Sequence, residues 1–312
     1  MSDPGDEIVD VVDDDNHVVE ALPRRIMRER RLFHRCTYVF VLDPQGRLYV
    51  HRRTETKDVY PGSFDVCAGG VNAAGESYDD CARRELEEEL GVVARPVFRF
   101  LHRYVGPSGR VWGAAYDVVW DGEIRWQPEE VVWGEFVALD EVGPMIEREP
   151  FCPDGVEVFG RWRDWEGIRT AVPPDSAWVR ELVRIAFRPY VERIGAEPAP
   201  MLEDFGEAIA NSHVFVTDER DGVVVLATQG DHLLVRDLAV HPRSQGRGVG
   251  GRLMRFAEVR ARELGLEELR LFTNDAMWEN RGFYARLGYA ETGRAVEQGY
   301  RRVFFRKVLR GP

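Results

Sequence analysis

Cysteine is scarce in this sequence, and its few cysteines are far apart. The four of them, Cys36, Cys67, Cys81 and Cys152, include no CxxC pair. Structural zinc sites need cysteine or histidine ligands at close spacing, and disulfide frameworks need many cysteines in a short chain. Neither pattern is present, so we expect four free thiols in a reducing cytosol.

Long apolar runs and surplus positive charge are absent too, and we expect no secretory leader. A membrane-spanning helix needs about 20 consecutive apolar residues, and no run approaches that length. The opening stretch, MSDPGDEIVDVVDDDN, is acidic and lacks the basic start and apolar core of a signal peptide. With a formal net charge of −12, the chain lacks the basic surface of a phosphate-backbone binder. We therefore expect a cytoplasmic protein that binds neither membranes nor nucleic acid.

What is present indicates two globular domains. The 312 residues are 44% hydrophobic and 11% aromatic, which is enough for two ordinary cores. The pair Pro173-Pro174 interrupts regular structure near the middle. We predict two α/β domains, residues 1–170 and 176–312, joined by a linker at 171–175. The predicted strands lie within CTYVFVLDPQGRLYVHRR, AAYDVVW, GEFVAL, HVFVTDE, VVVLAT, HLLVRDLAV, ELRLFT and RRVFFRKVL.

One predicted helix, within residues 69–92 (GGVNAAGESYDDCARRELEEELGV), crowds carboxylates together and ends at Gly91. Glu85, Glu88 and Glu89 stand at i, i+3 and i+4, so they share one face and repel each other. A hard divalent cation such as Mg²⁺ takes oxygen ligands and would remove this repulsion. A charge run on a surface helix is more often simply solvated. The triad alone leaves both interpretations open.

The spacing around the triad is more specific. It runs Gly70, five residues, Glu76, seven residues, Arg84-Glu85-Leu86, one residue, Glu88-Glu89, one residue, Gly91-Val92. Every fixed position of the Nudix box is matched, and about the first half of the chain resembles a Nudix hydrolase. The resemblance implies an α/β/α sandwich with a mixed sheet. It also implies metal-dependent attack of water on a small-molecule diphosphate, such as a nucleoside diphosphate linked to another group.

By motif position, the resemblance implies Mg²⁺ or Mn²⁺ ligands at Glu85, Glu88 and Glu89, with Glu88 and Glu89 also catalytic. Arg84 and Glu76 would orient these ligands, as the surroundings of metal sites generally do. The proton acceptor stays open between a member of the trio and a loop acid; the loop candidates are Glu129 and Glu130.

Isopentenyl-diphosphate isomerases are a rival within the same superfamily, because YPGSFDVCAGG and the nearby HRR resemble them. Those enzymes need a cysteine and a histidine ahead of the box. Here the two positions hold Gly69 and Val71, and Cys67 lies two residues away. The complete box favours hydrolysis, and we expect Cys67 to be a buried thiol.

In the second half, a glycine-rich turn joins a strand to an amphipathic helix. The glycines of QGRGVGG let backbone N–H groups approach an anion at a helix N-terminus. Residues 245–250 fit the Q/R-x-x-G-x-G/A loop of GNAT acetyltransferases, after the strand DLAV. Downstream, TNDAMWENRGFYARLGY supplies an asparagine and F-Y-x-x-x-G-Y. Residues 175–309 therefore resemble that family, which implies an α/β domain with a splayed mixed sheet.

This second resemblance implies acetyl-CoA as cosubstrate and an amine as acceptor. Tyr284 would be the acid that protonates the departing thiolate, since an unperturbed phenol has a pKa of about 10. Asn280 would either bind the cofactor or cap its helix. The strand residues beside the pantetheine arm would be Leu238, Ala239 and Val240. The pyrophosphate would lie against the backbone of Gln245, Gly246, Arg247, Gly248, Val249 and Gly250.

The base that deprotonates the amine is left open among four residues: Asp231, His232, Asp237 and Asn274. A small amine, an antibiotic, a peptide and a protein lysine all remain as acceptors. We predict a bifunctional enzyme that combines metal-dependent diphosphate hydrolysis with acetyl transfer. Two alternatives are an acyl-CoA-sensing second domain that regulates the hydrolase, and an isomerase with an appended acetyltransferase.

Overall fold

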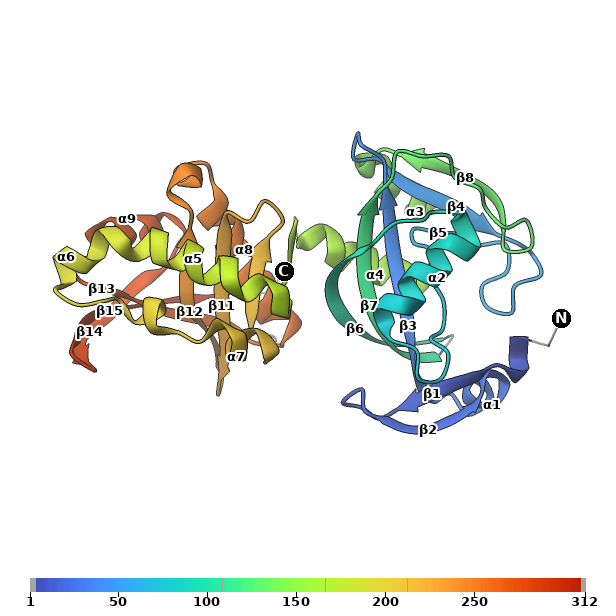
Figure 1. The fold of residues 1–312 in the computed structure, drawn as a ribbon, viewed down its shortest axis with the longest axis horizontal. Coiled ribbons are helices and arrows are strands. Elements are labelled where there is room, and N and C mark those ends of the chain that lie inside the picture. Colours follow the sequence, from blue (N-terminus) through green and yellow to red (C-terminus); the bar gives the residue numbers. More distant parts are fainter. Residues whose placement is uncertain (1–3, 108, 166, 212, 310–312) are drawn as a thin grey trace. The chain divides into compact units, whose positions relative to one another are not determined.

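The computed structural model describes residues 4–107, 109–165, 167–211 and 213–309, which form two compact units, Met1–Arg163 and Asp164–Pro312 (Figure 1). Both are α/β with a mixed sheet, as predicted. The division falls before the predicted boundary at residue 170, because β9 (Ile168–Thr170) pairs with β10 (Val214–Thr217) in the second sheet. The two prolines lie in the short 3₁₀ helix η2 (Pro173–Asp175), inside the second unit.

An eight-stranded mixed sheet forms the first unit. Its centre is the parallel pair β3 and β7, which runs in register from Phe33↔Arg110 to Leu42↔Val119. Beyond this pair the sheet is antiparallel. The strands are β1 (Ile8–Val12), β2 (Val18–Pro23), β3 (Phe33–Leu42), β4 (Leu48–Arg53), β5 (Phe64–Asp65), β6 (Val97–Gly106), β7 (Gly109–Val119) and β8 (Val131–Val137).

Helices cover both faces of this sheet, because side chains alternate along β3. Val39 and Val41 point to α2, where they share a core with Leu86. Phe40 points to the opposite face, and its ring lies 4.9 Å from that of Trp162 in α4. The described helices of this unit are α1 (Arg24–Glu29), α2 (Tyr78–Leu90), α3 (Leu139–Arg148) and α4 (Pro153–Asp164).

Helix α2 is the predicted acidic helix, and local signals define both of its ends. Ser77 is the N-cap, and its hydroxyl accepts a hydrogen bond from the Asp80 amide. Gly91 ends the helix at a φ of 65°, a left-handed conformation that favours glycine. Leu86 and Leu90 are buried against the sheet, so the face that carries the acids is turned elsewhere.

The second unit is a seven-stranded sheet in the order β14-β15-β13-β12-β11-β10-β9. Among its described pairings, only β12 with β13 is parallel. The further strands are β11 (Gly222–Gln229), β12 (His232–Val240), β13 (Glu268–Asn274), β14 (Ala290–Glu297) and β15 (Tyr300–Val308). The helices are α5 (Ser176–Phe187), α6 (Val191–Ile194), α7 (Phe205–Ala210), α8 (Val249–Glu263) and α9 (Trp278–Arg286), with 3₁₀ turns such as η4 (Ala199–Leu202).

The second unit also has a core on each face of its sheet. Val179 and Val183 of α5 pack with Val223 and Val225 of β11. On the other face, Phe256 of α8 joins an aromatic cluster, with ring centroids 4.8 Å from Trp165 and 4.9 Å from Phe215. This packing holds α8, which follows the glycine turn, against the sheet.

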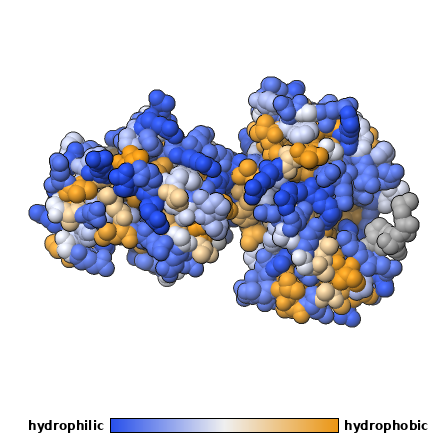
Figure 2. Space-filling model, in the orientation of Figure 1, coloured by the Kyte–Doolittle hydropathy of each residue, from blue (hydrophilic) through white to orange (hydrophobic). Residues whose placement is uncertain are grey.

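The face drawn in Figure 2 is mainly hydrophilic, and hydrophobic residues are exposed over β1 and β2. All four cysteines are free and buried. None of the helices in the described ranges has the length and apolarity that crossing a membrane requires.

Two candidate active sites

A cavity of about 550 Å³ in the first unit contains the predicted metal ligands. Glu85, Glu88 and Glu89 of α2 all line it, together with both loop acids proposed as bases, Glu129 and Glu130. Segments that are distant in the sequence therefore meet here: α1, β3, the loop after β4, α2 and the loop before β8.

Arg84 fixes two members of the trio. Its Nη1 donates to Glu85 Oε1 at 2.8 Å and to Glu88 Oε2 at 3.0 Å. Its Nε and Nη2 donate to the two carboxylate oxygens of Glu76, at 2.8 and 3.0 Å. The Arg84 guanidinium therefore binds Glu76 and, at the same time, two predicted metal ligands, Glu85 and Glu88.

Glu89 lies deepest, with 7% of its surface exposed. Its Oε2 accepts a hydrogen bond from the Gly69 amide at 3.2 Å, and its Oε1 lies 3.9 Å from Lys57 Nζ. Burial raises the pKa of Glu89, and burial together with the Glu89 charge raises the pKa of Glu85 to about 7. The Glu85 carboxylate also packs so closely on Gly70 that a Cβ at position 70 would overlap this carboxylate.

The donor chemistry of this cavity fits a hard divalent cation. Carboxylate oxygens are the ligands that Mg²⁺ and Mn²⁺ prefer, and two of these carboxylates are held at a cost in desolvation and repulsion. Among the described residues, no three acidic, histidine or cysteine groups already converge as a ready coordination shell. Arg84 and Lys57 instead form ion pairs with the trio.

The charge of the cavity supports the same conclusion. Among its described lining residues, nine acids face five cationic side chains. The acids are Glu7, Asp58, Asp65, Glu85, Glu88, Glu89, Glu129, Glu130 and Asp154, and the cations are Arg24, Arg28, Arg53, Lys57 and Arg84. The cavity is therefore net negative and would repel an anionic diphosphate. Divalent cations bound together with the substrate would remove this repulsion.

The positions that separate a hydrolase from the isomerases are also in this cavity. Gly69 and Val71 line it and supply neither thiol nor imidazole. Cys67 Sγ lies 3.4 Å from Asp65 Oδ1, and burial raises the pKa of the thiol far above its ordinary range. Cys67 is a buried, protonated thiol, as expected.

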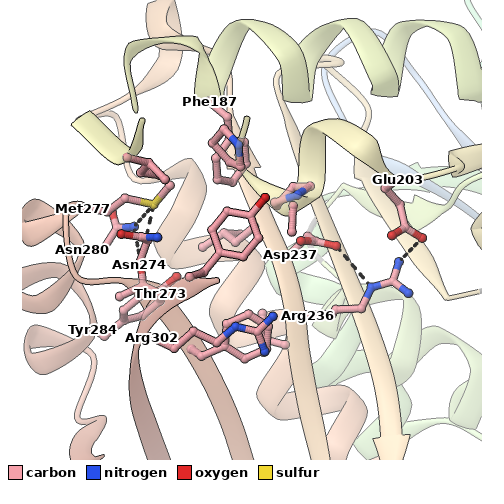
Figure 3. Close-up of a pocket in the computed structure, with 18 residues that line it drawn as sticks. Phe187, Glu203, Arg236, Asp237, Thr273, Asn274, Met277, Asn280, Tyr284 and Arg302 are labelled. Atoms are coloured by element: carbon pink, nitrogen blue, oxygen red, sulfur yellow. Dashed lines mark hydrogen bonds and ion pairs between the residues drawn. The ribbon is translucent and has the colours of Figure 1, made fainter. Parts of the chain in front are cut away.

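A second cavity, of about 220 Å³, opens where β12 and β13 separate (Figure 3). The two strands pair from Leu233↔Leu269 to Val235↔Leu271, and the described pairing stops there. The register between β11 and β12 shifts at the same place, so Arg236 is an extra residue of the bulge. Bulges bend a strand and redirect its side chains. Beyond Val235, β12 therefore has an open edge on its β13 side.

Asp237 and Tyr284 both line this cavity, on β12 and α9 (Figure 3). Asp237 accepts from Arg236 Nε at 3.2 Å, and Arg236 Nη2 also donates to Glu203 at 2.7 Å. Burial raises the pKa of Asp237 to about 6. Burial and the Asp237 charge raise the pKa of Tyr284, which keeps its phenol protonated. Among the described residues, the Tyr284 hydroxyl has no hydrogen-bond partner, whereas a tyrosine buried only for packing usually has one.

The structure separates the four candidate bases. Asp237 and Asn274 line the cavity, whereas Asp231 and His232 do not. Asp231 is exposed and pairs with His232. The Asn274 side chain accepts from the Ala276 amide, as a turn residue.

Asn280 also lines the cavity, and it does not cap its helix. The N-cap of α9 is Met277, and Asn280 Nδ2 instead donates to Thr273 Oγ1 at 2.9 Å. The side chain thus ties α9 to the end of β13, on the cavity wall (Figure 3).

The glycine turn presents backbone to solvent. Gly246 and Gly248 adopt φ values of 75° and 89°, and each has open space where a Cβ would lie. Gly248 is the N-cap of α8, and no described side chain caps this helix. Gln245 folds back, with Nε2 donating to Val240 O at 3.1 Å. The first N–H groups of α8 are therefore available to an anion.

Known proteins resemble each unit. A NUDIX domain profile matches residues 32–182, and an acetyltransferase (GNAT) domain profile matches residues 210–291. An uncharacterised Nudix hydrolase of Streptomyces coelicolor, SCO1686, is 45% identical over 165 residues, which cover 52% of this chain and 91% of that protein. An uncharacterised Nudix hydrolase of Yersinia pestis is 41% identical over 163 residues, covering 50% and 85%.

Among solved structures, PaiA N-acetyltransferase from Thermoplasma acidophilum, in complex with coenzyme A, has a TM-score of 0.39 and 17% identity, covering 45% of this chain and 97% of that protein. The chain belongs to the Nudix hydrolase family and carries a GNAT acetyltransferase domain after its Nudix domain. Both are enzyme families.

Sequence reasoning missed several charged residues of the first cavity. Arg24 and Arg28 lie on α1, which the sequence did not predict, and Arg53 and Lys57 flank the end of β4. The run PRRIMRERR, basic within an acidic chain, is the signal that could have drawn attention to α1.

Proposed function

We propose that the first unit hydrolyses a small-molecule diphosphate with Mg²⁺ or Mn²⁺ held by Glu85, Glu88 and Glu89. The observation that carries this proposal is that three mutually repelling carboxylates, of which Glu89 is buried, line one net negative cavity. A bound divalent ion would supply charge neutralisation and a water of lowered pKa. Arg84 would keep two ligands in position, and the Gly69 amide would orient Glu89.

Of the two loop acids, Glu129 is the better base. Glu130 forms an ion pair with Lys57, whereas Glu129 forms none among the described residues and lines the same cavity. An unpaired carboxylate accepts a proton from water more readily than one neutralised by a lysine.

The test is Glu88→Gln beside Glu87→Gln. Both residues are exposed on α2, but only Glu88 lines the cavity. Mn²⁺ binding, followed by electron paramagnetic resonance, and phosphate release from a panel of nucleoside and prenyl diphosphates should both fall in Glu88→Gln alone. Equal behaviour of the two variants would contradict the metal assignment. An allylic product without phosphate release would instead identify an isomerase.

For the second unit, we propose acetyl transfer from acetyl-CoA to an amine in the gap between β12 and β13. The glycine turn would hold the pyrophosphate of CoA, and the open edge at Leu238, Ala239 and Val240 would pair with its pantetheine arm. Asp237 is the proposed base, and Tyr284 the acid that protonates the thiolate. The supporting observation is that both face one cavity at the point where the strands part.

Tyr284→Phe tests this assignment, since it removes one hydroxyl without changing the ring. Thiol release with pooled amines should fall, while acetyl-CoA affinity stays within about twofold. An undiminished rate would make Tyr284 a structural residue. Binding of acetyl-CoA with no thiol release from the unaltered protein would favour the sensor alternative.

A further inference from the structure

A wall of basic side chains lies in the same cavity as the acidic helix. Arg24 and Arg28 come from α1, Arg53 ends β4, and Lys57 follows in the next loop. Helix α1 precedes residues 32–182, which match the NUDIX profile, so two of these four cations come from outside the matched segment.

The arginines are held in place but not fully satisfied. Arg28 Nη1 donates to Asp58 at 2.7 Å, and Arg24 Nη1 donates to Glu7 at 3.2 Å. These contacts fix α1 against the cavity. Among the described residues, the Nε atoms of Arg24 and Arg53 are nonetheless buried without a hydrogen-bond partner. The one described carboxylate within ion-pair distance of Arg53 is that of Asp65, at 3.8 Å. Buried donors without an acceptor are rare and costly.

The like charges also oppose one another. Burial lowers the pKa of Arg28, and the neighbouring charges of Arg24 and Arg53 lower it further. This is the mirror image of the acidic trio, where burial and like charge also act together. An anion between the arginines would satisfy the orphan donors and offset the repulsion in one step.

We propose that Arg24, Arg28 and Arg53 bind non-bridging oxygens of the diphosphate on the side away from the metal. The inference rests on the proposed hydrolase function and extends it. The diphosphate would lie between the carboxylates that hold the metal and the basic wall formed by these arginines. Planar guanidinium forks suit phosphate oxygens, and Lys57 adds a point charge between the two walls.

The probe is methylenediphosphonate, a diphosphate analogue that cannot be hydrolysed, titrated calorimetrically into the full chain with Mg²⁺. Arg24→Gln and Arg53→Gln should each weaken binding about tenfold, since each removes a charge-assisted contact. Arg25→Gln is the matched control, because Arg25 lies on the same helix and pairs with Asp6 at the surface. Arg25→Gln should bind methylenediphosphonate as tightly as the unaltered protein. Arg24→Lys should bind it more tightly than Arg24→Gln, because lysine restores the positive charge.

Unchanged affinity in Arg24→Gln and Arg53→Gln would overturn the proposal. If Arg24→Gln lowers the melting temperature by loss of its Glu7 contact, Arg53→Gln decides, because the Arg53 side chain donates no direct hydrogen bond within the described part of the chain. The two proposals fail separately. Arginine-dependent binding without hydrolysis of any diphosphate refutes only the hydrolase, whereas hydrolysis with arginine-independent binding refutes only the basic wall.

Discussion

Under the proposed functions, the two units bind a pyrophosphate in opposite ways. The first surrounds it with charge, using carboxylates for metal ions on one wall and arginines on the other. The second uses the neutral N–H groups of a glycine turn at the start of α8, a helix that no side chain in the described ranges caps.

The difference follows from where the chemistry occurs. In diphosphate hydrolysis, charge develops on the phosphate itself, so a metal ion is needed at the reacting atoms. In acetyl transfer, the pyrophosphate is a handle and the reacting thioester lies elsewhere, so dipoles and hydrogen bonds suffice. Each of the following experiments should therefore affect one unit and spare the other.

Metal removal is expected to have the largest effect. Dialysis against EDTA should lower phosphate release at least about 10³-fold, because the metal supplies several kcal/mol of charge stabilisation. Acetyl transfer should not change, since the proposed groups of that site are side chains and backbone. Parallel assays of phosphate and thiol release, before and after Mg²⁺ is restored, measure both. A loss of acetyl transfer that Mg²⁺ restores would break the comparison.

Replacement of the proposed base of the first unit comes next. Glu129→Gln should reduce hydrolysis about 10²- to 10³-fold, in the range of general-base catalysis. Glu130→Gln is the matched control, since that carboxylate is neutralised by Lys57. Its rate should fall far less. Steady-state phosphate release measures both, and a reversed order would move the role of base to Glu130.

The proposed base of the second unit should determine how the kcat/KM of acetyl transfer depends on pH. Asp237, with a pKa raised to about 6 by burial, is protonated below pH 6 and anionic above it. The kcat/KM of acetyl transfer should therefore rise as the pH increases through about 6. Asp237→Asn should lower the rate about 10²-fold and remove this limb. If kcat/KM still rises near pH 6 in Asp237→Asn, a group other than Asp237 causes the rise.

The smallest expected effect is at the glycine turn. Gly248→Ala places a side chain at a φ of 89°, which costs about 1–2 kcal/mol and disturbs the N–H groups behind it. Acetyl-CoA affinity should weaken about tenfold, while phosphate release stays unchanged. Isothermal titration calorimetry with acetyl-CoA measures the affinity. Gly265→Ala, at a φ of 69° after α8, is a control for backbone strain alone and should bind normally.

Local patterns carried much of the prediction. The acidic helix was predictable, because Ser77, the i, i+3, i+4 spacing and Gly91 act within a few residues of one another. The glycine turn was predictable for the same reason. Long-range features were not: β9 joins the second sheet through pairing with β10, more than forty residues away, which no local periodicity encodes.

The sequence by itself determined that three carboxylates share a helix face and that a glycine turn opens α8, since both depend on the geometry of one helix. Tertiary structure alone brought Arg24, Arg28 and Arg53 to the acidic cavity. It also placed Asp237, and not Asp231, in the second cavity, through the bulge at Arg236 and the parting of β12 from β13. Burial and proximity, which decide pKa and charge balance, arise only when distant segments pack together.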